Sequence, residues 1–344
     1  MLGLSILSLV ALAAASPIPG SDPLSLYRRA DVTQSTLNTF DYYVEHASAA
    51  YCNAGKAAGT AVTCSGTCNN VQKNSVKILG TYDGKATGIS GYTAIDDVRK
   101  EIVFSVRGSA NIRNWIANLD FDFKSLDLAR NAKVHDGFNK AWLEISAAVL
   151  AQVKETASKN AGYKVVAVGH SLGGAVATLG AAYLRNAGHS VDIYTYGAPR
   201  IGNAELSDFI SGQPGAVYRV TQTNDPVPRL PPKLFGYRHV SPEYWLSKSS
   251  STGQYDVGTV KVCAGNANTG CNGSQNIIDI SSIATHLSYF NKILSGCISF
   301  GLRDVDDVDV VSVQVEGDLA NDDDALVAQL NAWAEADRNI TASA

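Results

Sequence analysis

A single serine lies among glycines between two apolar stretches, in VVAVGHSLGGAV (165–176). G-x-S-x-G alone is a weak signal in a chain with 30 glycines. The flanks are more specific, because the β-branched run YKVVAVGH (163–170) predicts a buried strand and the Ala-rich run AVATLGAAYLRNAG (175–188) predicts a helix. A strand that turns sharply into a helix holds the serine out at the edge of a sheet. Ser171 is therefore a candidate nucleophile, with an inert helix-capping serine as the alternative.

A serine hydroxyl is a weak nucleophile unless a base accepts its proton. Three histidines follow Ser171 in the chain. His189 lies in the helix-ending turn NAGHS, at the opposite sheet edge, and His239 lies in GYRHVSPEYW, which we expect to form a surface hairpin. His286, in SSIATHLSYF, follows a short loop that can bring it back over the edge. We therefore predict His286 as the base, with an ordinary surface or core histidine as the alternative.

The base needs a carboxylate that orients its ring and stabilises its charged form. Asp225, in TNDPVPRLPP, follows the predicted strand VYRVTQT (217–223). Loops at the carboxyl ends of parallel strands gather catalytic side chains, which favours Asp225. Asp256 and Asp279 remain competitors, whereas Asp192 starts a strand and falls at the wrong edge. A simple Asn-Asp-Pro turn is the alternative for Asp225.

Two groups are candidates for stabilising an oxyanion beside Ser171. Leu172 opens the following helix, whose N-terminus favours negative charge. Ser109 follows the predicted strand KEIVFSVRG (100–108) at the same edge, and it offers its N–H and its hydroxyl.

The residues after Ser109 have the periodicity of a short amphipathic helix. Its apolar face holds Ile112, Trp115, Ile116 and Leu119. Its polar face holds Asn111, Arg113, Asn114 and Asn118. From periodicity alone, ordinary surface packing is the expected role.

Strands alternate with helices along the middle of the chain. Besides the runs above, SVDIYTYGAP (190–199) predicts a strand, and FNKAWLEISAAVLAQVKETASK (138–159) predicts a helix with one apolar stripe. This order predicts the α/β class, with a largely parallel sheet covered by helices on both faces. Hydrophobic residues make up 45% of the chain and charged residues 17%, without a basic tract, which argues against a nucleic-acid partner.

The N-terminus is typical of an exported protein. Residues 1–15 contain a short apolar run that ends in small residues and predict a signal peptide. Residues 16–29 are rich in proline and serine and end in a dibasic Arg28-Arg29, which predicts a pro-segment. We expect the mature chain to begin near Ala30 and to be secreted.

Six cysteines in a secreted chain predict disulfides. The short spacings in CSGTC and CAGNANTGC favour two local pairs and leave the two outermost cysteines for a third. The predicted bonds are Cys64–Cys68, Cys263–Cys271 and Cys52–Cys297. A zinc site is the alternative, but no Cys or His pair has the spacing of a zinc finger or of H-E-x-x-H. We expect no metal and no cofactor.

Seven segments together resemble the class 3 lipases of filamentous fungi, most closely the secreted Fusarium type. They are FSVRGSANIRNWIANLDF, VHDGF, VGHSLGGA, YTYGAPRIGN, TNDPVPRLPP, GYRHVSPEYW and THLSYF. The resemblance implies an α/β-hydrolase-like fold for residues 30–300 and hydrolysis of triacylglycerol, with cleavage of phospholipids at the sn-1 ester in some relatives. It also implies Ser171, Asp225 and His286 as the catalytic triad, Ser109 and Leu172 as the oxyanion hole, and residues 110–118 as a mobile lid.

The resemblance sets the expected partner and two alternative functions. The expected partner is lipid at an oil–water or membrane interface, met by a monomer without a protein partner. The pair Cys263 and Cys271 resembles a cystine of the feruloyl esterase branch, so a soluble aromatic ester is the second candidate substrate. The apolar face of the lid, with Trp115, argues against that substrate and predicts activation at a lipid interface. A catalytically inactive lipid-binding relative is the third candidate.

The C-terminal extension, residues 301–344, holds eleven acidic residues and two arginines, a net charge of −9. Within it, DDDALVAQLNAW predicts a helix with acids at its start and one apolar side. One interpretation is a solubilising, partly disordered tail. The other is a folding or inhibitory segment that docks near the lid and is later removed. Sequons at Asn272 and Asn339 permit glycosylation.

Overall fold

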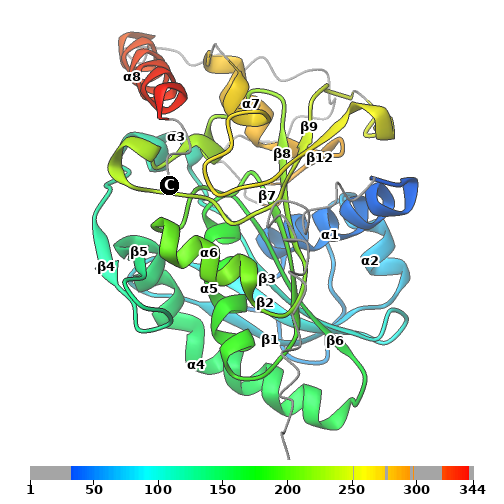
Figure 1. The fold of residues 1–344 in the computed structure, drawn as a ribbon. Helices are drawn as coiled ribbons and strands as arrows, with labels where there is room; N and C mark the ends of the chain where they lie inside the picture. Colours follow the sequence, from blue (N-terminus) through cyan, green and yellow to red (C-terminus); the bar gives the residue numbers. More distant parts are fainter. Residues whose placement is uncertain (1–31, 251, 276–277, 295–296, 298–319, 341–344) are drawn as a thin grey trace, which may run out of the picture. The chain divides into compact units, whose positions relative to one another are not determined.

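The structure, a computed structural model, describes residues 32–250, 252–275, 278–294, 297 and 320–340. The predicted signal peptide and pro-segment lie outside these ranges. The centre is an eight-stranded sheet in the order β1-β2-β3-β6-β7-β8-β9-β10 (Figure 1). Its strands are β1 (Lys77–Asp83), β2 (Ser90–Asp96), β3 (Glu101–Val106), β6 (Lys164–His170), β7 (Val191–Tyr196), β8 (Val217–Gln222), β9 (Glu243–Leu246) and β10 (Val260–Cys263).

The middle of the sheet is parallel, as predicted. Each neighbouring pair from β3 to β9 runs parallel, whereas β1, β2 and β10 pair antiparallel with their neighbours. The parallel strands therefore end at one common edge. β6 ends immediately before Ser171, β8 ends three residues before Asp225, and β3 ends three residues before Ser109.

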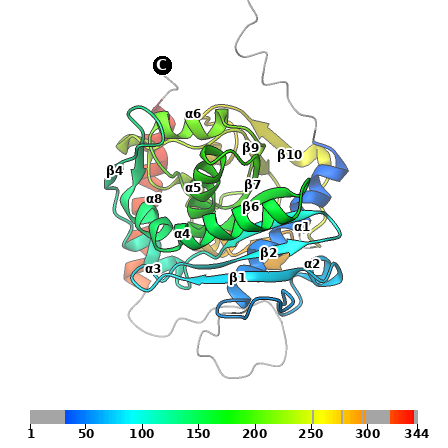
Figure 2. The ribbon, with the colours of Figure 1, turned by 90° about the horizontal axis from the view of Figure 1, so that it is seen from below.

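Helices cover both faces of the sheet (Figure 2). On one face lies α1 (Gln34–Cys52), and on the other lie α4 (Asp136–Lys159) and α5 (Leu172–Asn186). Side chains alternate along β3, so that Ile102 and Phe104 pack with α4 and α5 while Val103 packs with α1. The apolar stripe predicted on α4 is buried against this face: Phe138, Trp142, Ile145, Val149 and Val153.

Shorter elements connect the sheet to its edge. They are α2 (Asn69–Lys73), α3 (Ile112–Ala117), β4 (Phe123–Ser125), β5 (Lys133–His135), α6 (Ala204–Gly212), η2 (Val227–Arg229), η3 (Lys233–Phe235), η4 (Val257–Thr259), η5 (Asn272–Ser274), α7 (Ile280–His286), β11 (Ser288–Tyr289), β12 (Lys292–Ile293) and α8 (Ala320–Asn339). Figure 1 shows α3, α7 and α8 gathered at one end of the sheet.

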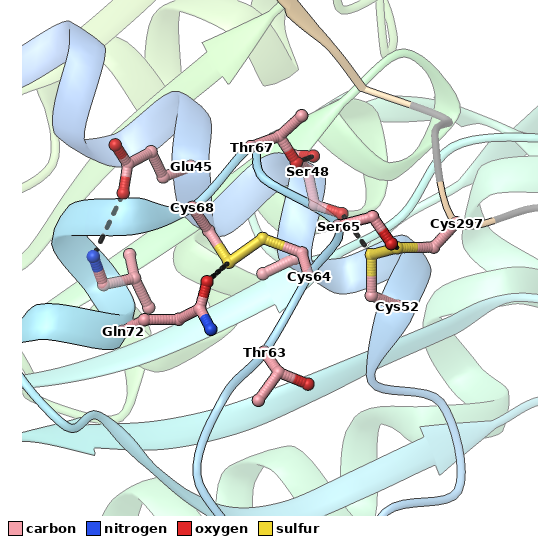
Figure 3. The surroundings of a disulfide bond; sticks show 12 residues. Glu45, Ser48, Cys52, Thr63, Cys64, Ser65, Thr67, Cys68, Gln72 and Cys297 are labelled. Atoms are coloured by element: carbon pink, nitrogen blue, oxygen red, sulfur yellow. Dashed lines mark hydrogen bonds between the residues drawn. A yellow bond between two sulfur atoms is a disulfide. The ribbon is translucent and has the colours of Figure 1, made fainter. Parts of the chain in front are cut away.

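All six cysteines are paired in the structure, so none is left as a zinc ligand. The bonds are Cys52–Cys297, Cys64–Cys68 and Cys263–Cys271. Figure 3 shows the first two side by side at the end of α1, where Cys52 ties the helix to a position 245 residues further along the chain. Close by, Glu45 on α1 accepts hydrogen bonds from the first backbone N–H groups of α2.

Four buried histidines have a pKa lowered by burial, which favours their neutral form. Burial is the largest cause in each case, and it lowers the pKa of His46 to about 3. The pKa of His135 is also lowered, and those of His170 and His239 lie well below the ordinary value. A folded chain with neutral histidines cannot take up the protons that its unfolded form accepts, so acid favours unfolding.

We therefore predict that stability falls as the pH drops below about 6.5, the ordinary histidine pKa. Each histidine with a lowered pKa reduces the free energy of unfolding by up to about 1.4 kcal/mol for every pH unit below that value. For His46 the loss continues down to about pH 3. Urea unfolding at pH 7.5 and 5.0 measures the fall, and His46→Gln should make it shallower. Equal stability at the two pH values would contradict the prediction.

Candidate active site

Ser171 occupies a strained turn between β6 and α5. Its φ of 56° and ψ of −134° lie outside the regions that L-residues normally adopt. Close backbone contacts enforce the turn. A Cβ on Gly169 would lie 2.4 Å from the carbonyl oxygen of Gly173, and a Cβ on Gly173 would lie 2.3 Å from that of Val106 on β3. Gly169 is therefore required by the tightness of the turn itself, and Gly173 by the contact of the turn with the neighbouring strand.

His286 and Asp225 meet beyond the same sheet edge. His286 is the last residue of α7, and Asp225 lies in the turn between β8 and η2. His286 Nδ1 donates to Asp225, at 3.0 Å from Oδ1 and 2.9 Å from Oδ2, and both side chains are fully buried. Gly197, just after β7, makes room for the pair: a Cβ there would lie 2.7 Å from Asp225 Oδ2 and 2.8 Å from the His286 ring.

Three neighbours fix the position of Asp225. Tyr289 donates its hydroxyl to Oδ2 at 2.6 Å, and the Val227 N–H donates to Oδ1 at 2.9 Å. The Asn272 amide donates to the backbone carbonyl oxygen of Asp225 at 3.0 Å. Burial, and then the Asp225 charge, raises the pKa of Tyr289 well above its ordinary value, so the phenol remains a proton donor. The sequence analysis did not predict these roles, and the one signal that points to them is the position of Tyr289 three residues after His286.

The structure forms no hydrogen bond between Ser171 and His286. Ser171 Oγ and His286 Nε2 are both buried, and neither atom has a hydrogen-bond partner among the described residues. The two residues still lie close together, because the ring of His170 stacks on that of His286 with centroids 4.5 Å apart. Catalytic pairs are often loose without substrate and tighten when it binds. Both atoms are therefore free to form a hydrogen bond with each other or with a bound ligand.

A buried chain of hydrogen bonds runs behind Ser171. The Gly108 N–H donates to the Tyr51 hydroxyl oxygen at 2.9 Å, and that hydroxyl donates to His170 Nδ1 at 2.7 Å. His170 Nε2 then donates to the carbonyl oxygen of His286 at 2.9 Å. His170 is neutral, as its lowered pKa requires, with its proton on Nε2. The chain links the residue before Ser109 to the backbone of His286, and neither Tyr51 nor His170 was predicted to contribute.

The two predicted oxyanion donors flank Ser171. Leu172 is the first residue of α5, where backbone N–H groups have no partner within the helix. Ser109 follows Gly108, and a Cβ on Gly108 would lie 2.8 Å from Ser171 Cβ. The Ser109 hydroxyl donates to the carbonyl oxygen of Asn111 at 3.2 Å and accepts from its N–H at 3.3 Å. This hydroxyl is thus tied to the segment that leads into α3.

The predicted amphipathic helix is α3, which begins after its cap Asn111. The apolar face turns inward, and Ile116 is buried in a cluster with Val227 and Leu230, close behind Asp225 in the chain. The other apolar residues of this face pack partly buried around the cluster: Ile112, Trp115 and Leu119. The helix therefore covers the loop that holds the carboxylate.

The competing side chains have other partners. His239 is buried and bonds to a backbone carbonyl, so the expected surface hairpin is wrong: this segment leads into β9 in the interior. Asp279 caps α7, Asp256 caps η4, and Asp192 accepts from a backbone N–H. His189 follows the end of α5, away from the edge that holds Ser171.

Known proteins match this chain over most of its length. The family model "Lipase (class 3)" matches residues 103–235. "Secreted mono- and diacylglycerol lipase 1" of Fusarium solani is 49% identical over 297 residues, 85% of this chain and 88% of the relative. The chain belongs to the class 3 lipase family.

Solved structures agree with this membership. An MDLA mutant from Penicillium cyclopium is similar with a TM-score of 0.73 at 34% identity, covering 77% of this lipase and 100% of that chain. A structure described as "A serine protease triad forms the catalytic centre of a triacylglycerol lipase" has a TM-score of 0.69 at 31% identity, covering 78% and 98%. The predicted α/β-hydrolase-like fold is confirmed.

We predict that Tyr289→Phe slows the lipase without weakening substrate binding. The change removes one hydrogen bond to a charged group, worth about 1.5 to 3 kcal/mol, and leaves the ring in place. The expected result is a fall in kcat of roughly tenfold or more with little change in KM. Tyr255→Phe is the control, because the buried Tyr255 hydroxyl donates to Gln222 and not to Asp225. Equal effects of the two changes would contradict a specific role for Tyr289.

Proposed function

We propose that this lipase hydrolyses carboxylic esters of acylglycerols, with Ser171 as nucleophile, His286 as base and Asp225 as the orienting carboxylate. The observation that carries the proposal is the strained Ser171 turn beside a fully buried His286–Asp225 pair, with an amphipathic helix packed on the loop that holds Asp225. Burial of all three side chains excludes bulk water and strengthens each electrostatic contact.

The proposed reaction assigns one step to each of these groups. Ser171 Oγ attacks the ester carbonyl carbon while its proton passes to His286 Nε2. Asp225 stays ionised and stabilises the resulting imidazolium through Nδ1. The N–H groups of Leu172 and Ser109 receive the negative charge on the former carbonyl oxygen. The imidazolium then protonates the leaving alcohol, and water, activated by His286, hydrolyses the acyl-enzyme.

Mono- and diacylglycerols are the first candidate substrates, because the Fusarium solani relative carries them in its name. Triacylglycerol and the sn-1 ester of phospholipids are the next candidates, and a soluble feruloyl ester is the alternative. A panel of these four classes, assayed as matched emulsions or solutions, ranks them. Clear preference for the feruloyl ester would overturn the lipid assignment, and no turnover of any ester would favour an inactive lipid-binding relative.

The proposed site of action is outside the cell. The apolar N-terminus predicts export, and the relative from Fusarium solani is named as secreted. Among the described residues no helix is long and apolar enough to cross a membrane. Of the two sequons, Asn272 is buried with its amide bonded to backbone carbonyls, whereas Asn339 is exposed at the end of α8. Asn339 is therefore the acceptor that we expect to carry a glycan.

Ser171→Ala should abolish turnover while the chain stays folded. The expected fall in kcat/KM is roughly 10⁴- to 10⁶-fold, because the hydroxyl supplies the only nucleophile of the mechanism. Hydrolysis of p-nitrophenyl butyrate measures the loss, and circular dichroism checks the fold. The control is Ser158→Ala at an exposed serine on α4, which should retain full activity. Retained activity of Ser171→Ala would contradict the assignment.

The position of α3 predicts activation at an interface. An apolar helix face can leave the protein at low cost only where oil replaces water. The rate on a short-chain triglyceride should therefore rise steeply once its concentration exceeds solubility. Equal rates on dissolved and emulsified ester, at matched accessible substrate, would contradict a lid that opens at an interface.

A further inference from the structure

The C-terminal helix α8 packs on the same apolar surface as α3. Its inner face buries Leu330 and Ala334, which share a cluster with Ile116 of α3, Val227 and Leu230 of the η2 turn, and Ile278 before α7. Leu326 and Trp333 pack partly buried around this cluster, and the Trp333 ring lies 5.3 Å from that of Phe121, just after α3. Figures 1 and 2 both show α8 beside α3. The helix thus covers the cluster that joins the lid to the loop of the proposed triad carboxylate.

Polar contacts set the position of α8 along this surface. The Asn331 side chain accepts from the Ile278 N–H at 2.9 Å and donates to the Ile278 carbonyl oxygen at 2.7 Å. Asp337 pairs with Arg200 at 2.7 Å, and both side chains are more than nine-tenths buried. Arg200 in turn donates to backbone carbonyls at the end of the η2 segment. Paired amide and charge contacts of this kind specify one register, which apolar packing alone does not.

One contact joins α8 to α3 directly. Arg113, on the polar face of α3, forms an ion pair with Asp323 in the first turn of α8. The two helices are therefore joined by their polar as well as their apolar sides. While α8 stays docked, movement of α3 away from Val227 and Leu230 breaks this pair and removes Ile116 from the cluster that buries Leu330 and Ala334.

We propose that α3, the η2 turn and Ile278 form a docking surface for an acidic amphipathic helix, which the chain fills with its own α8. While docked, α8 holds α3 closed and occupies the apolar surface that a lipid interface would otherwise contact. Displacement of α8 by lipid, or its removal by proteolysis, frees α3 to open. The proposal rests on the proposed function of α3 as the lid. Of the two interpretations of the C-terminal extension, the proposal favours the docked inhibitory segment over the solubilising tail.

The first test displaces α8 in the full chain. Leu330→Asp and Ala334→Asp together place two carboxylates in the buried contact, whereas Gln329→Asp adds a carboxylate at the exposed neighbour and serves as the control. Hydrogen exchange reports docking of α8 and protection of the α3 amides. The double variant should exchange rapidly in both helices and hydrolyse dissolved p-nitrophenyl butyrate about tenfold faster, the factor that 1.4 kcal/mol of lost closed-state stability gives. The control should match the wild type.

A second test uses the ion pair, where substitution is compatible with folding. Arg113→Glu and Asp323→Arg should each raise activity on dissolved ester severalfold, and the charge-swapped double variant should return it toward the wild-type value. A synthetic peptide of residues 320–340 added to the Leu330→Asp, Ala334→Asp chain should restore inhibition and α3 protection. The same peptide with Leu330→Asp should do neither.

The outcomes separate this inference from the function on which it rests. If α8 is displaced and the activity is unchanged, or only the melting temperature falls, then α8 stabilises the fold and the proposal is wrong. If α8 remains docked in the Leu330→Asp, Ala334→Asp variant, the apolar face of α8 is not what holds the helix in place, and the proposal is also wrong. If no variant hydrolyses any ester, the proposed function fails, while the exchange of the α3 amides still decides whether α8 restrains that helix.

Discussion

The site depends on the contact of three backbone segments at the carboxyl edge of the sheet. The turn after β6 packs so closely that neither glycine beside Ser171 has room for a Cβ: Gly169 lies against the start of α5, and Gly173 lies against the end of β3. This contact holds Ser171 in a conformation that an unconstrained L-residue avoids. It also brings Gly108, the residue before Ser109, against Ser171 at the N-terminus of α5. The proposed nucleophile and the proposed oxyanion donors are thus positioned by the ends of core elements.

The charged half of the site is built differently, from a chain of buried hydrogen bonds. The Tyr289 hydroxyl and His286 Nδ1 both donate hydrogen bonds to the Asp225 carboxylate, and the backbone N–H of Val227 donates to it as well. Ionised groups are costly to bury without partners, so each neighbour that satisfies Asp225 also fixes its direction. Among the described residues, Ser171 Oγ and His286 Nε2 are buried without a hydrogen-bond partner. The helices α3 and α8 cover the loop that follows Asp225, through Val227 and Leu230.

Local patterns predicted the strand and helix on either side of Ser171 and the strand before Asp225, but not α7, of which His286 is the last residue. The β6–Ser171–α5 turn and the α4 stripe follow from glycine placement and periodicity, and His286 and Asp225 follow from chain order and sheet edge. The helix α1 escaped prediction because a run from Tyr42 to Tyr51 is buried on every side, which removes the amphipathic signal. Tyr51, Tyr289 and Asn272 act through contacts between residues far apart in the chain, and no spacing marks such contacts. The docking of α8 could not be predicted for the same reason, because the surface on which it packs is built by residues far from it in the chain.

A crystal structure of the lipase reacted with an alkylphosphonate ester tests the central claim most directly, because the adduct imitates the tetrahedral intermediate. We expect a single covalent bond from phosphorus to Ser171 Oγ. We also expect the phosphoryl oxygen within hydrogen-bond distance of the Leu172 and Ser109 N–H groups, with His286 Nε2 facing Ser171 Oγ and Asp225 unmoved. An adduct on another residue, or a His286 ring that stays out of reach of Ser171 Oγ, would contradict it.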